Sequence, residues 1–473
     1  MKKLISLFLV FVLTISLCAC GTAGTAEQPG AQTTAPASGG LMVGFAKENI
    51  TPEETVPLSG SASRGESNGM LDYLFATCVA MSNGGEDTVL VYSLDIQNAY
   101  SPTASWRNTI SRSTGIPEDR IMLCFTHTHS APDTGSEAAS ISRYNSKVSD
   151  KLVKAAKTAV EDMSAAQAYT SSIATENLNF VRRYIMNDGT LVGDNFGDTS
   201  SGYKCHETEV DNVLQLVKFV RQEGDDIIMA NFQMHSNFTI REPSVSSDVA
   251  GAFRDALEQK SGVNVIYLNG ASGNVNPNSR FADENIVSTH REWGQKLADY
   301  AMSAAENFAP AELTTVTSEQ SVFTIETNHA DDHLAAKASE INAYFESTGD
   351  RSGADKMCAE AGISSIYHAS TIVGNSRRDK TATVELDVIC IGDIAFMFAP
   401  VELFDTSGMY IKEKSPYDMT FICGYANHCQ GYMPSEQAYE LIGYEVATTM
   451  FAKGTAEKVA DEILRMLNDH YEK

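Results

Sequence analysis

Two histidines separated by a single residue are the part of this sequence with the clearest chemical potential. Residues 126–132 read THTHSAP and directly follow the apolar run 121–125. An apolar run bounded by turn residues predicts a buried strand, and side chains at positions i and i+2 of a strand point to the same face. We therefore expect His127 and His129 side by side at the strand's end. Such a pair indicates a metal site, or a metal ligand beside a general base, although the motif alone would rather suggest two solvated loop histidines.

A third histidine and a carboxylate end similar apolar runs. His235 follows the run 227–234, and Glu402 follows the run 394–400. Zinc takes three or four nitrogen or oxygen ligands and, in catalytic sites, leaves one position for water. Each residue alone also fits a structural role, as a buried hydrogen-bonded histidine or as a glutamate favoured by a helix N-terminus. The repetition at several strand ends favours one shared site.

The spacing of the histidines excludes one familiar metal motif and leaves another open. The metallo-β-lactamase pattern HxHxDH, started at His127, requires an aspartate and a histidine where this chain has Ala131 and Pro132. Spacing alone leaves a three-histidine site of the carbonic anhydrase kind open. The loop 424–434 adds tyrosines and a histidine as further polar candidates.

The elements that must position these residues alternate along the chain. Apolar runs that end in polar or small residues lie at 88–94, 227–234, 265–268 and 394–400. Amphipathic stretches lie between such runs, at 150–163, 250–260 and 291–307. Strands that alternate with helices predict an α/β fold with a mixed central sheet flanked by helices and the metal site at the strand ends.

The first forty residues differ from the rest of the chain. Residues 1–19 combine two lysines with an apolar run too short to span a membrane, as in a secretory signal, and Leu17 and Ala19 before Cys20 resemble a bacterial lipobox. Residues 21–40 are rich in small residues and proline and cannot bury a core. We predict a signal peptide at 1–19, a lipidated Cys20 with a flexible tether at 20–40, and one catalytic domain at 41–473. The protein would be secreted and anchored to the bacterial cell membrane, outside the cytoplasm; an ordinary cleavable signal is the alternative.

The charge of the chain restricts its partners. The formal net charge is −26 at pH 7. This surface argues against nucleic acid and against broad adhesion to anionic lipid, but not against a neutral or amphipathic substrate. Membrane contact is expected through the lipid anchor, and the oligomeric state stays open.

Together these motifs resemble the neutral/alkaline (non-lysosomal) ceramidases, zinc amidases that split the N-acyl bond of ceramide. GFAKENITP at 44–52 is similar to the family's opening GxxxxDITP, and residues 126–132 match its THTHSGP signature with Ala131 in place of glycine. Further similar segments are LSG at 58–60, LDYL at 71–74, SLD at 93–95, NF at 231–232, SD at 247–248, GNVNP at 273–277, GY at 431–432 and YE at 444–445. The resemblance spans nearly the whole body.

The resemblance implies a role for each matching position. The Zn²⁺ ligands would be His127, His235, Glu402 and Tyr432. His129 would be the base beside the zinc-bound water, and Tyr444 would contact the substrate carbonyl. Arg182 would be the arginine of the site, with Arg183 as the alternative if the register is shifted by one. Amide hydrolysis needs these parts: an activated water, a stabilised oxyanion and a proton for the leaving amine.

Three departures bear on the substrate. GNVNP at 273–277 replaces the family's GDxSP, Val181 stands where many relatives have asparagine, and the chain shows no sign of the all-β C-terminal domain of established ceramidases. The implied function is a zinc-dependent hydrolase that cleaves an N-acyl amide bond, with a ceramide-like lipid favoured. The alternatives are a zinc amidase or esterase for a peptide or N-acyl amino acid, and a non-catalytic solute-binding lipoprotein.

Overall fold

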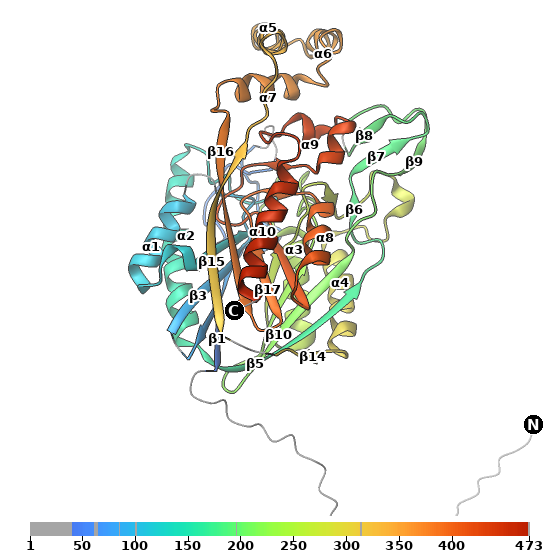
Figure 1. Ribbon diagram of the computed structural model, residues 1–473. Coiled ribbons are helices and arrows are strands. Elements are labelled where there is room, and N and C mark those ends of the chain that lie inside the picture. The colour runs from blue at the N-terminus through green and yellow to red at the C-terminus, as the bar shows by residue number, and fades with distance from the viewer. Residues whose placement is uncertain are drawn as a thin grey trace, which may run out of the picture. The chain divides into compact units, whose positions relative to one another are not determined.

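A nine-stranded mixed sheet is the largest element of the fold (Figure 1). Its strands follow the order β12-β11-β10-β5-β1-β2-β3-β4, and β14 pairs with β5. β11 and β12 are parallel, as are β3 and β4, whereas the other pairs are antiparallel. The bounds are β1 Leu41–Asn49, β2 Phe75–Asn83, β3 Glu86–Leu94, β4 Ile121–Phe125, β5 Ser164–Ala174, β10 Val213–Arg221, β11 Ile227–Phe232, β12 Asn264–Asn269 and β14 Ala309–Pro310.

The computed structural model describes residues 40–60, 65–84, 86–99, 102–194, 196–312 and 315–471. The predicted signal peptide, the lipidation site Cys20 and the tether up to residue 39 lie outside these ranges. Among the described residues, no helix has both the length and the apolar character needed to cross a membrane.

A second sheet packs face to face against the first. It contains β15 (Val316–Glu326), β16 (Thr381–Ile391), β17 (Ile394–Phe398) and β19 (Met419–Cys423), and β17 and β19 are parallel. Side chains of both sheets form one buried cluster, in which Val91 and Met122 meet Phe396 and Phe421. Successive strand residues point to opposite faces, so Leu90 and Tyr92 join a different cluster beneath helices.

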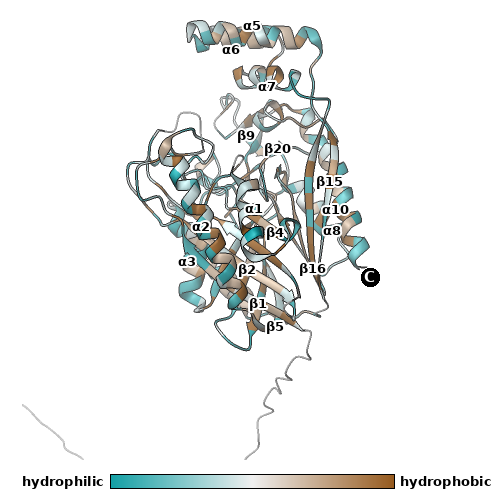
Figure 2. Ribbon diagram, turned by 90° about the vertical axis from the view of Figure 1, so that its left-hand side faces the viewer, coloured by the Kyte–Doolittle hydropathy of each residue, from teal (hydrophilic) through white to brown (hydrophobic). Residues whose placement is uncertain are grey.

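Helices cover both outer faces of this pair of sheets. α1 (Thr103–Thr114), α2 (Ala139–Glu161), α3 (Asp248–Ser261) and α4 (His290–Ala305) pack on the large sheet, while α8 (Asp405–Lys414) and α10 (Thr455–Tyr471) pack on the small one. The hydrophobic colouring of Figure 2 accordingly concentrates on the strands between the helical layers. The predicted mixed sheet flanked by helices is confirmed, and it is one of two stacked sheets.

Smaller elements lie around the ends of the strands. The insertion between β15 and β16 contains α5 (Asp332–Thr348), α6 (Arg351–Glu360) and α7 (Ile366–Ser376), which share their own apolar cluster at the top of Figure 1. The short elements are β6 Phe180–Val181, β7 Arg183–Met186, β8 Leu191–Gly193, β9 Tyr203–His206, β13 Val275–Asn276, β18 Glu402–Leu403, β20 Tyr432–Met433 and α9 Tyr444–Ala447.

Candidate metal centre

The carboxyl ends of three strands, each paired with a parallel neighbour, lie close together. His127 follows β4, His235 follows β11 and Glu402 follows β17, and each of these strands has a parallel neighbour. The two edges of the large sheet are brought together, since Ser93 Oγ on β3 donates to the Tyr267 carbonyl on β12 at 2.5 Å. Residues far apart in sequence therefore converge, as expected at the carboxyl ends of such strands.

Two histidines face one carboxylate oxygen. Nε2 of His127 lies 3.5 Å from Oε2 of Glu402, and Nε2 of His235 lies 3.3 Å from the same oxygen. All three side chains are buried. His235 Nε2 and Glu402 Oε2 make no hydrogen bond to any part of the chain that the structure describes. Buried polar atoms that make no hydrogen bond are rare and energetically costly, so this pair fits a site built for a cation.

The other ring nitrogen of each histidine has a backbone partner. Nδ1 of His127 lies 2.9 Å from the Gln97 carbonyl oxygen, Nδ1 of His129 lies 3.0 Å from that of Gly60, and Nδ1 of His235 lies 2.7 Å from that of Ser272. A carbonyl only accepts, so each neutral ring carries its proton on Nδ1 and presents the Nε2 lone pair. The ligand atoms of the three rings lie within 4.8 Å of one another, so this group could hold a metal ion.

Burial sets the charge state of the same groups. It lowers the pKa of His127 and of His235 well below the usual value and raises the pKa of Glu402, although the charge of Arg182 opposes the latter shift. Both rings are therefore neutral and could serve as metal ligands. A His/His/carboxylate set is one that zinc accepts in catalytic sites.

Strand alternation does not explain how His127 meets His129, which corrects the expectation from the sequence. β4 ends at Phe125, and His127 has a positive φ of 60°. The ring centroids lie 4.8 Å apart at an interplanar angle of 80°. The two rings meet because the chain turns sharply after the strand.

Tyr432 lies beside this group through a second pairing. Glu402 and Tyr432 are direct partners in the parallel pairing of β18 with β20. The Tyr432 ring stacks on His235 at 6.4 Å, and its hydroxyl accepts a hydrogen bond from Arg182 Nη2 at 3.0 Å. Burial and the Glu402 charge raise the pKa of Tyr432, and Arg182 opposes this. The four residues named as ligands from the sequence are thus neighbours in the structure.

Of the two adjacent arginines, Arg182 faces the centre. Its guanidinium also donates to Glu445 Oε1 at 2.8 Å, to the Gly273 carbonyl at 2.9 Å and to Asn276 Oδ1 at 3.2 Å. Arg183 pairs with Glu207, donates to the carbonyls of residues 438 and 441, and places its Nη1 3.5 Å from Glu445 Oε2. Both guanidinium groups therefore contact Glu445, and that of Arg182 also reaches Tyr432.

Tyr444, the first residue of α9, places a further aromatic ring next to Tyr432. Its ring centroid lies 5.8 Å from that of Tyr432, and it stacks on Phe196 at 5.1 Å with Tyr367 of α7 at 6.2 Å. Phe196 and Tyr367 are 40% and 43% exposed. A groove of about 330 Å³ opens here, lined by residues 191, 193, 196 and 197, by α6, by residues 363–365 and by residues 442–444 and 447. No signal in the sequence connects Phe196 or Tyr367 with the site.

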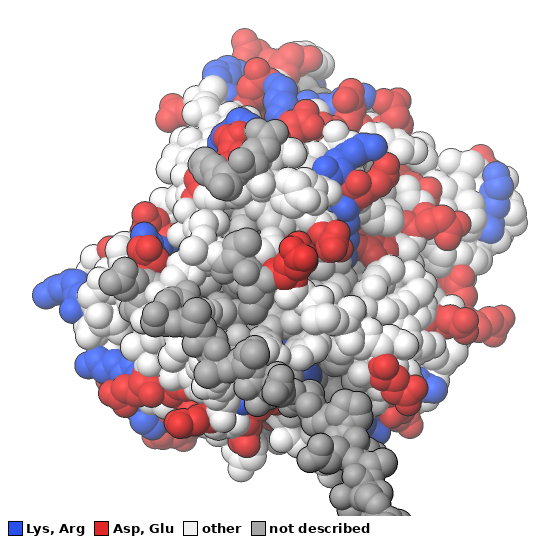
Figure 3. All heavy atoms as spheres, turned by 60° about the horizontal axis from the view of Figure 1, so that its bottom comes forward, with Lys and Arg blue, Asp and Glu red and all other residues white. Residues whose placement is uncertain are grey.

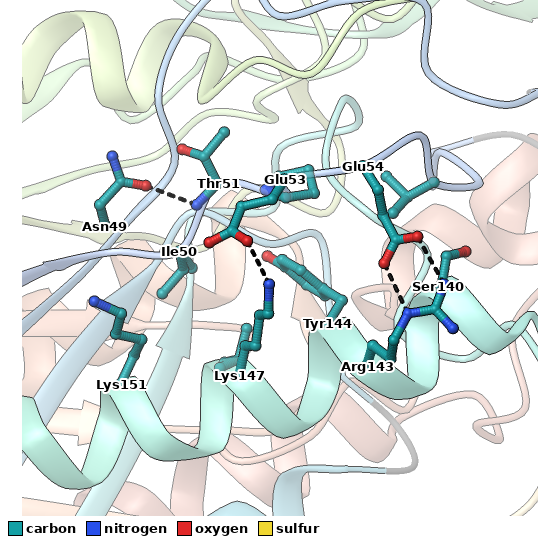
Figure 4. A pocket seen from close by; sticks show the side chains of 13 residues that line it. Asn49, Ile50, Thr51, Glu53, Glu54, Ser140, Arg143, Tyr144, Lys147 and Lys151 are labelled. Atoms are coloured by element: carbon teal, nitrogen blue, oxygen red, sulfur yellow. Dashed lines mark hydrogen bonds and ion pairs between the residues drawn. The ribbon is translucent and has the colours of Figure 1, made fainter.

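The segment 50–60 reaches the centre along α2. Glu53 pairs with Lys147 at 2.5 Å, and Glu54 makes a two-pronged pair with Arg143 at 2.6 and 2.9 Å (Figure 4). These pairs roof a pocket of about 40 Å³ whose lining includes none of the candidate ligands. Their role is to fasten the segment to the helix.

The same segment ends on the candidate base. Ser59 donates twice to the Ala131 carbonyl, and Gly60 accepts from His129 Nδ1. Gly60 has a φ of 105°, and a Cβ there would lie 2.5 Å from the His129 carbonyl oxygen and 2.7 Å from its Cβ. Only glycine permits this close approach.

The departures in residues 273–277 are accommodated by local partners. Asn274 Nδ2 donates to Asp405 Oδ1 at 2.7 Å, and its Oδ1 accepts from the Asp405 backbone N–H at 3.0 Å. An aspartate at position 274 would set two buried carboxylates against each other. Asn276 Oδ1 accepts from both Arg182 and Asn237, so it helps to orient the arginine.

Comparison with solved structures identifies the fold. The stacked sheets with a buried histidine–carboxylate group define a mixed α/β protein with a candidate metal centre. The fold is that of the neutral ceramidases. The chain is similar to the crystal structure of neutral ceramidase from Pseudomonas aeruginosa, with a TM-score of 0.67 and 17% identity over 91% of this chain and 74% of that one. It is equally similar to a ceramidase complexed with C2, with a TM-score of 0.67 and 15% identity over 92% and 76%.

No protein-family model and no curated protein matches the sequence. The resemblance stated from the motifs is nevertheless confirmed at the level of the fold. At such low identity the likeness concerns the fold, and the chemistry rests on the residues themselves.

Proposed function

We propose that this protein is a zinc-dependent hydrolase that cleaves an N-acyl amide bond, with a ceramide-like lipid as the favoured substrate. The observation that carries the proposal is the convergence of two imidazole Nε2 atoms on Glu402 Oε2, where His235 Nε2 and Glu402 Oε2 are buried and make no hydrogen bond among the described residues. Its occurrence in a fold shared with neutral ceramidases supports an amidase.

The ion would be held by four residues. His127, His235 and Glu402 supply the neutral nitrogen and carboxylate donors that suit zinc. Tyr432 would add a phenol oxygen, whose ionised form the metal would have to favour. When bound, zinc supplies an activated water near neutral pH and polarises the substrate carbonyl.

The chain's own residues then carry the proton and the charge. His129 Nε2 takes a proton from the attacking water and returns it to the leaving amine nitrogen. Tyr444 and Arg182 stabilise the oxyanion, each donor contributing about 3 kcal/mol. The partly exposed rings of Phe196 and Tyr367 lie against Tyr444 at the groove, where they would contact the apolar part of a substrate.

The testing experiment measures fatty-acid release from an N-acyl sphingosine. Zinc-loaded protein that begins at Gly21 is compared with His127→Ala and with His333→Ala, whose exposed histidine on α5 serves as the matched control. We expect cleavage by the parent and the control, and loss of both zinc and cleavage in His127→Ala. Full cleavage by zinc-free His127→Ala would refute the metal mechanism.

The same assay, with other substrates, tests the substrate class independently of the mechanism. A panel with N-acyl amino acids, short peptides and esters at equal concentration discriminates the lipid amidase from the non-lipid amidase or esterase. Absence of turnover on every substrate, with zinc bound, would favour a non-catalytic solute-binding lipoprotein.

We also propose that the protein is secreted and anchored to the bacterial cell membrane as a lipoprotein that faces outside the cytoplasm. The lipobox-like residues before Cys20 support this. On the face shown in Figure 3, basic side chains of the described residues are scattered among acidic ones rather than gathered in a patch, which argues against nucleic acid as a partner. Metabolic labelling with a fatty acid should mark the parent and Cys18→Ser but not Cys20→Ser.

A further inference from the structure

We propose that Gln97 is a positioning residue that keeps His129 a base rather than a metal ligand. Its carboxamide donates to His129 Nε2 and so occupies the lone pair that this nitrogen would otherwise offer to an ion. The inference rests on the proposed function, but the hydrogen bond and its effect on metal coordination can be tested without substrate.

The direction of this hydrogen bond follows from the other side of the ring. His129 Nδ1 faces the Gly60 carbonyl at 3.0 Å, and a carbonyl can only accept. The proton of the neutral ring is therefore on Nδ1, and Nε2 offers its lone pair. The Gln97 side-chain nitrogen lies 3.3 Å from Nε2 and must be the donor. Both the tautomer and the orientation of the amide are thereby determined.

The backbone of the same residue supports the neighbouring histidine. The Gln97 carbonyl accepts from His127 Nδ1 at 2.9 Å, and the Ile96 carbonyl accepts from the His127 backbone N–H at 3.1 Å. The segment after β3 is therefore tied to the segment after β4. A side-chain substitution at Gln97 leaves these backbone contacts in place.

His129 needs such a partner because it is close enough to coordinate. The ligand atoms of His127, His129 and His235 lie within 4.8 Å of one another. The Nε2 atoms of His127 and His235 face Glu402, whereas that of His129 faces Gln97. The three histidines therefore differ in role because their Nε2 atoms have different neighbours. In metal sites generally, hydrogen bonds from surrounding residues orient the side chains in this way.

A carboxamide suits both states of a base. Rotation of its terminal torsion exchanges the N–H donor for the carbonyl acceptor, so Gln97 can face the lone pair of neutral His129 and then the N–H of its protonated form. Nε2 has one lone pair, so the attacking water displaces the Gln97 N–H from it and then passes its proton to Nε2; the same proton leaves to the amine nitrogen. Methionine at this position can do neither.

The test uses full-length protein and three variants. Gln97→Met removes the donor at similar length, Gln97→Glu replaces it by an acceptor, and Asn98→Ala is the matched control. Asn98 is an adjacent, half-buried amide whose side chain makes no hydrogen bond with the residues that the structure describes. Folding is checked by urea unfolding of each variant.

Two readouts are independent of turnover. In metal-free protein, ¹⁵N spectra of the histidine rings, with His129→Ala for assignment, should show Nδ1–H and bare Nε2 for the parent and a proton on Nε2 in Gln97→Glu. In cobalt-substituted protein, Gln97→Met should change the visible spectrum towards a higher coordination number and bind the metal at least as tightly. The parent and Asn98→Ala should give the same spectrum.

Turnover is the third readout. We expect Gln97→Met to lower kcat by about 10- to 100-fold at nearly constant KM, within the range of general acid–base catalysis. Unchanged ring and cobalt spectra in both Gln97 variants would overturn the positioning role even if the parent is a good amidase. If the parent lacks amidase activity but the spectra change as stated, the proposed function fails while the role of Gln97 stands.

Discussion

The ring of Tyr425 lies flat against the imidazole of His127, with centroids 4.1 Å apart and planes inclined by 28°. Tyr425 is fully buried at a positive φ of 56°, and its hydroxyl lies 2.9 Å from Ser272 Oγ. The Ser272 carbonyl in turn accepts from His235 Nδ1. One tyrosine therefore supports one candidate ligand through its ring and the other through a serine.

Tyr425 should be needed for the ring more than for the hydroxyl. Tyr425→Phe keeps the stacking and loses one hydrogen bond, which costs about 1 kcal/mol of stability. Tyr425→Ala leaves a cavity beside His127, so we expect a loss of about 3–5 kcal/mol and weaker zinc binding. Urea unfolding and zinc titration measure the two effects. Equal zinc affinity in both variants would contradict the support of His127 by the ring.

Gly60→Ala should disturb His129 specifically. The new Cβ would collide with the His129 carbonyl and Cβ, and its φ of 105° is unfavourable for alanine. Gly115→Ala is the control, because its φ is 80° but no atom lies within 4 Å of the new Cβ. Backbone strain of about 1–3 kcal/mol is expected in both. Only Gly60→Ala should also lose turnover, by at least about 10-fold, with zinc retained; similar turnover of the two folded variants would count against a direct effect on the base.

The adjacent arginines should separate into catalysis and stability. Arg182→Lys keeps the charge but loses the planar fork that joins Glu445, Gly273 and Tyr432, so kcat should fall about 100-fold. Arg183→Lys loses the planar guanidinium that pairs with Glu207, so the free energy of unfolding should instead fall by about 1–3 kcal/mol. Kinetics and thermal unfolding of both variants decide the assignment. The reverse pattern would mean that Arg183 serves the site.

Asp405 should give part of the pH dependence of stability. Burial raises its pKa from 3.8 to about 7, with the Asp211 charge adding to the rise and the bonds from Asn274 and Thr406 opposing it. Because the folded pKa is above the unfolded one, its contribution is complete below pH 3.8 and is lost as the pH rises to about 7. Asp405→Asn should flatten that window in urea unfolding measured between about pH 4 and about pH 8. Parallel profiles for parent and variant would show that Asp405 ionises normally.

Local sequence patterns predicted most residues of the candidate metal centre. The apolar run 121–125 predicted β4, and the polar residues after three such runs proved to lie together. The prediction failed for the conformation after β4, because a positive φ at His127 depends on tertiary support such as the Tyr425 ring. It also missed the second sheet, since the period of two in a strand does not tell which sheet its faces meet.

The sequence by itself determined the kinds of ligand and their places at the ends of buried strands, because strand periodicity and side-chain chemistry are local properties. Only the tertiary structure decided which partner each group meets. It directed Arg182 rather than Arg183 to Tyr432, paired Glu402 with Tyr432 across β18 and β20, and set Gln97 against His129. These contacts join segments distant in sequence, and one residue of register reverses the direction of a side chain, so only packing of the two sheets resolves them.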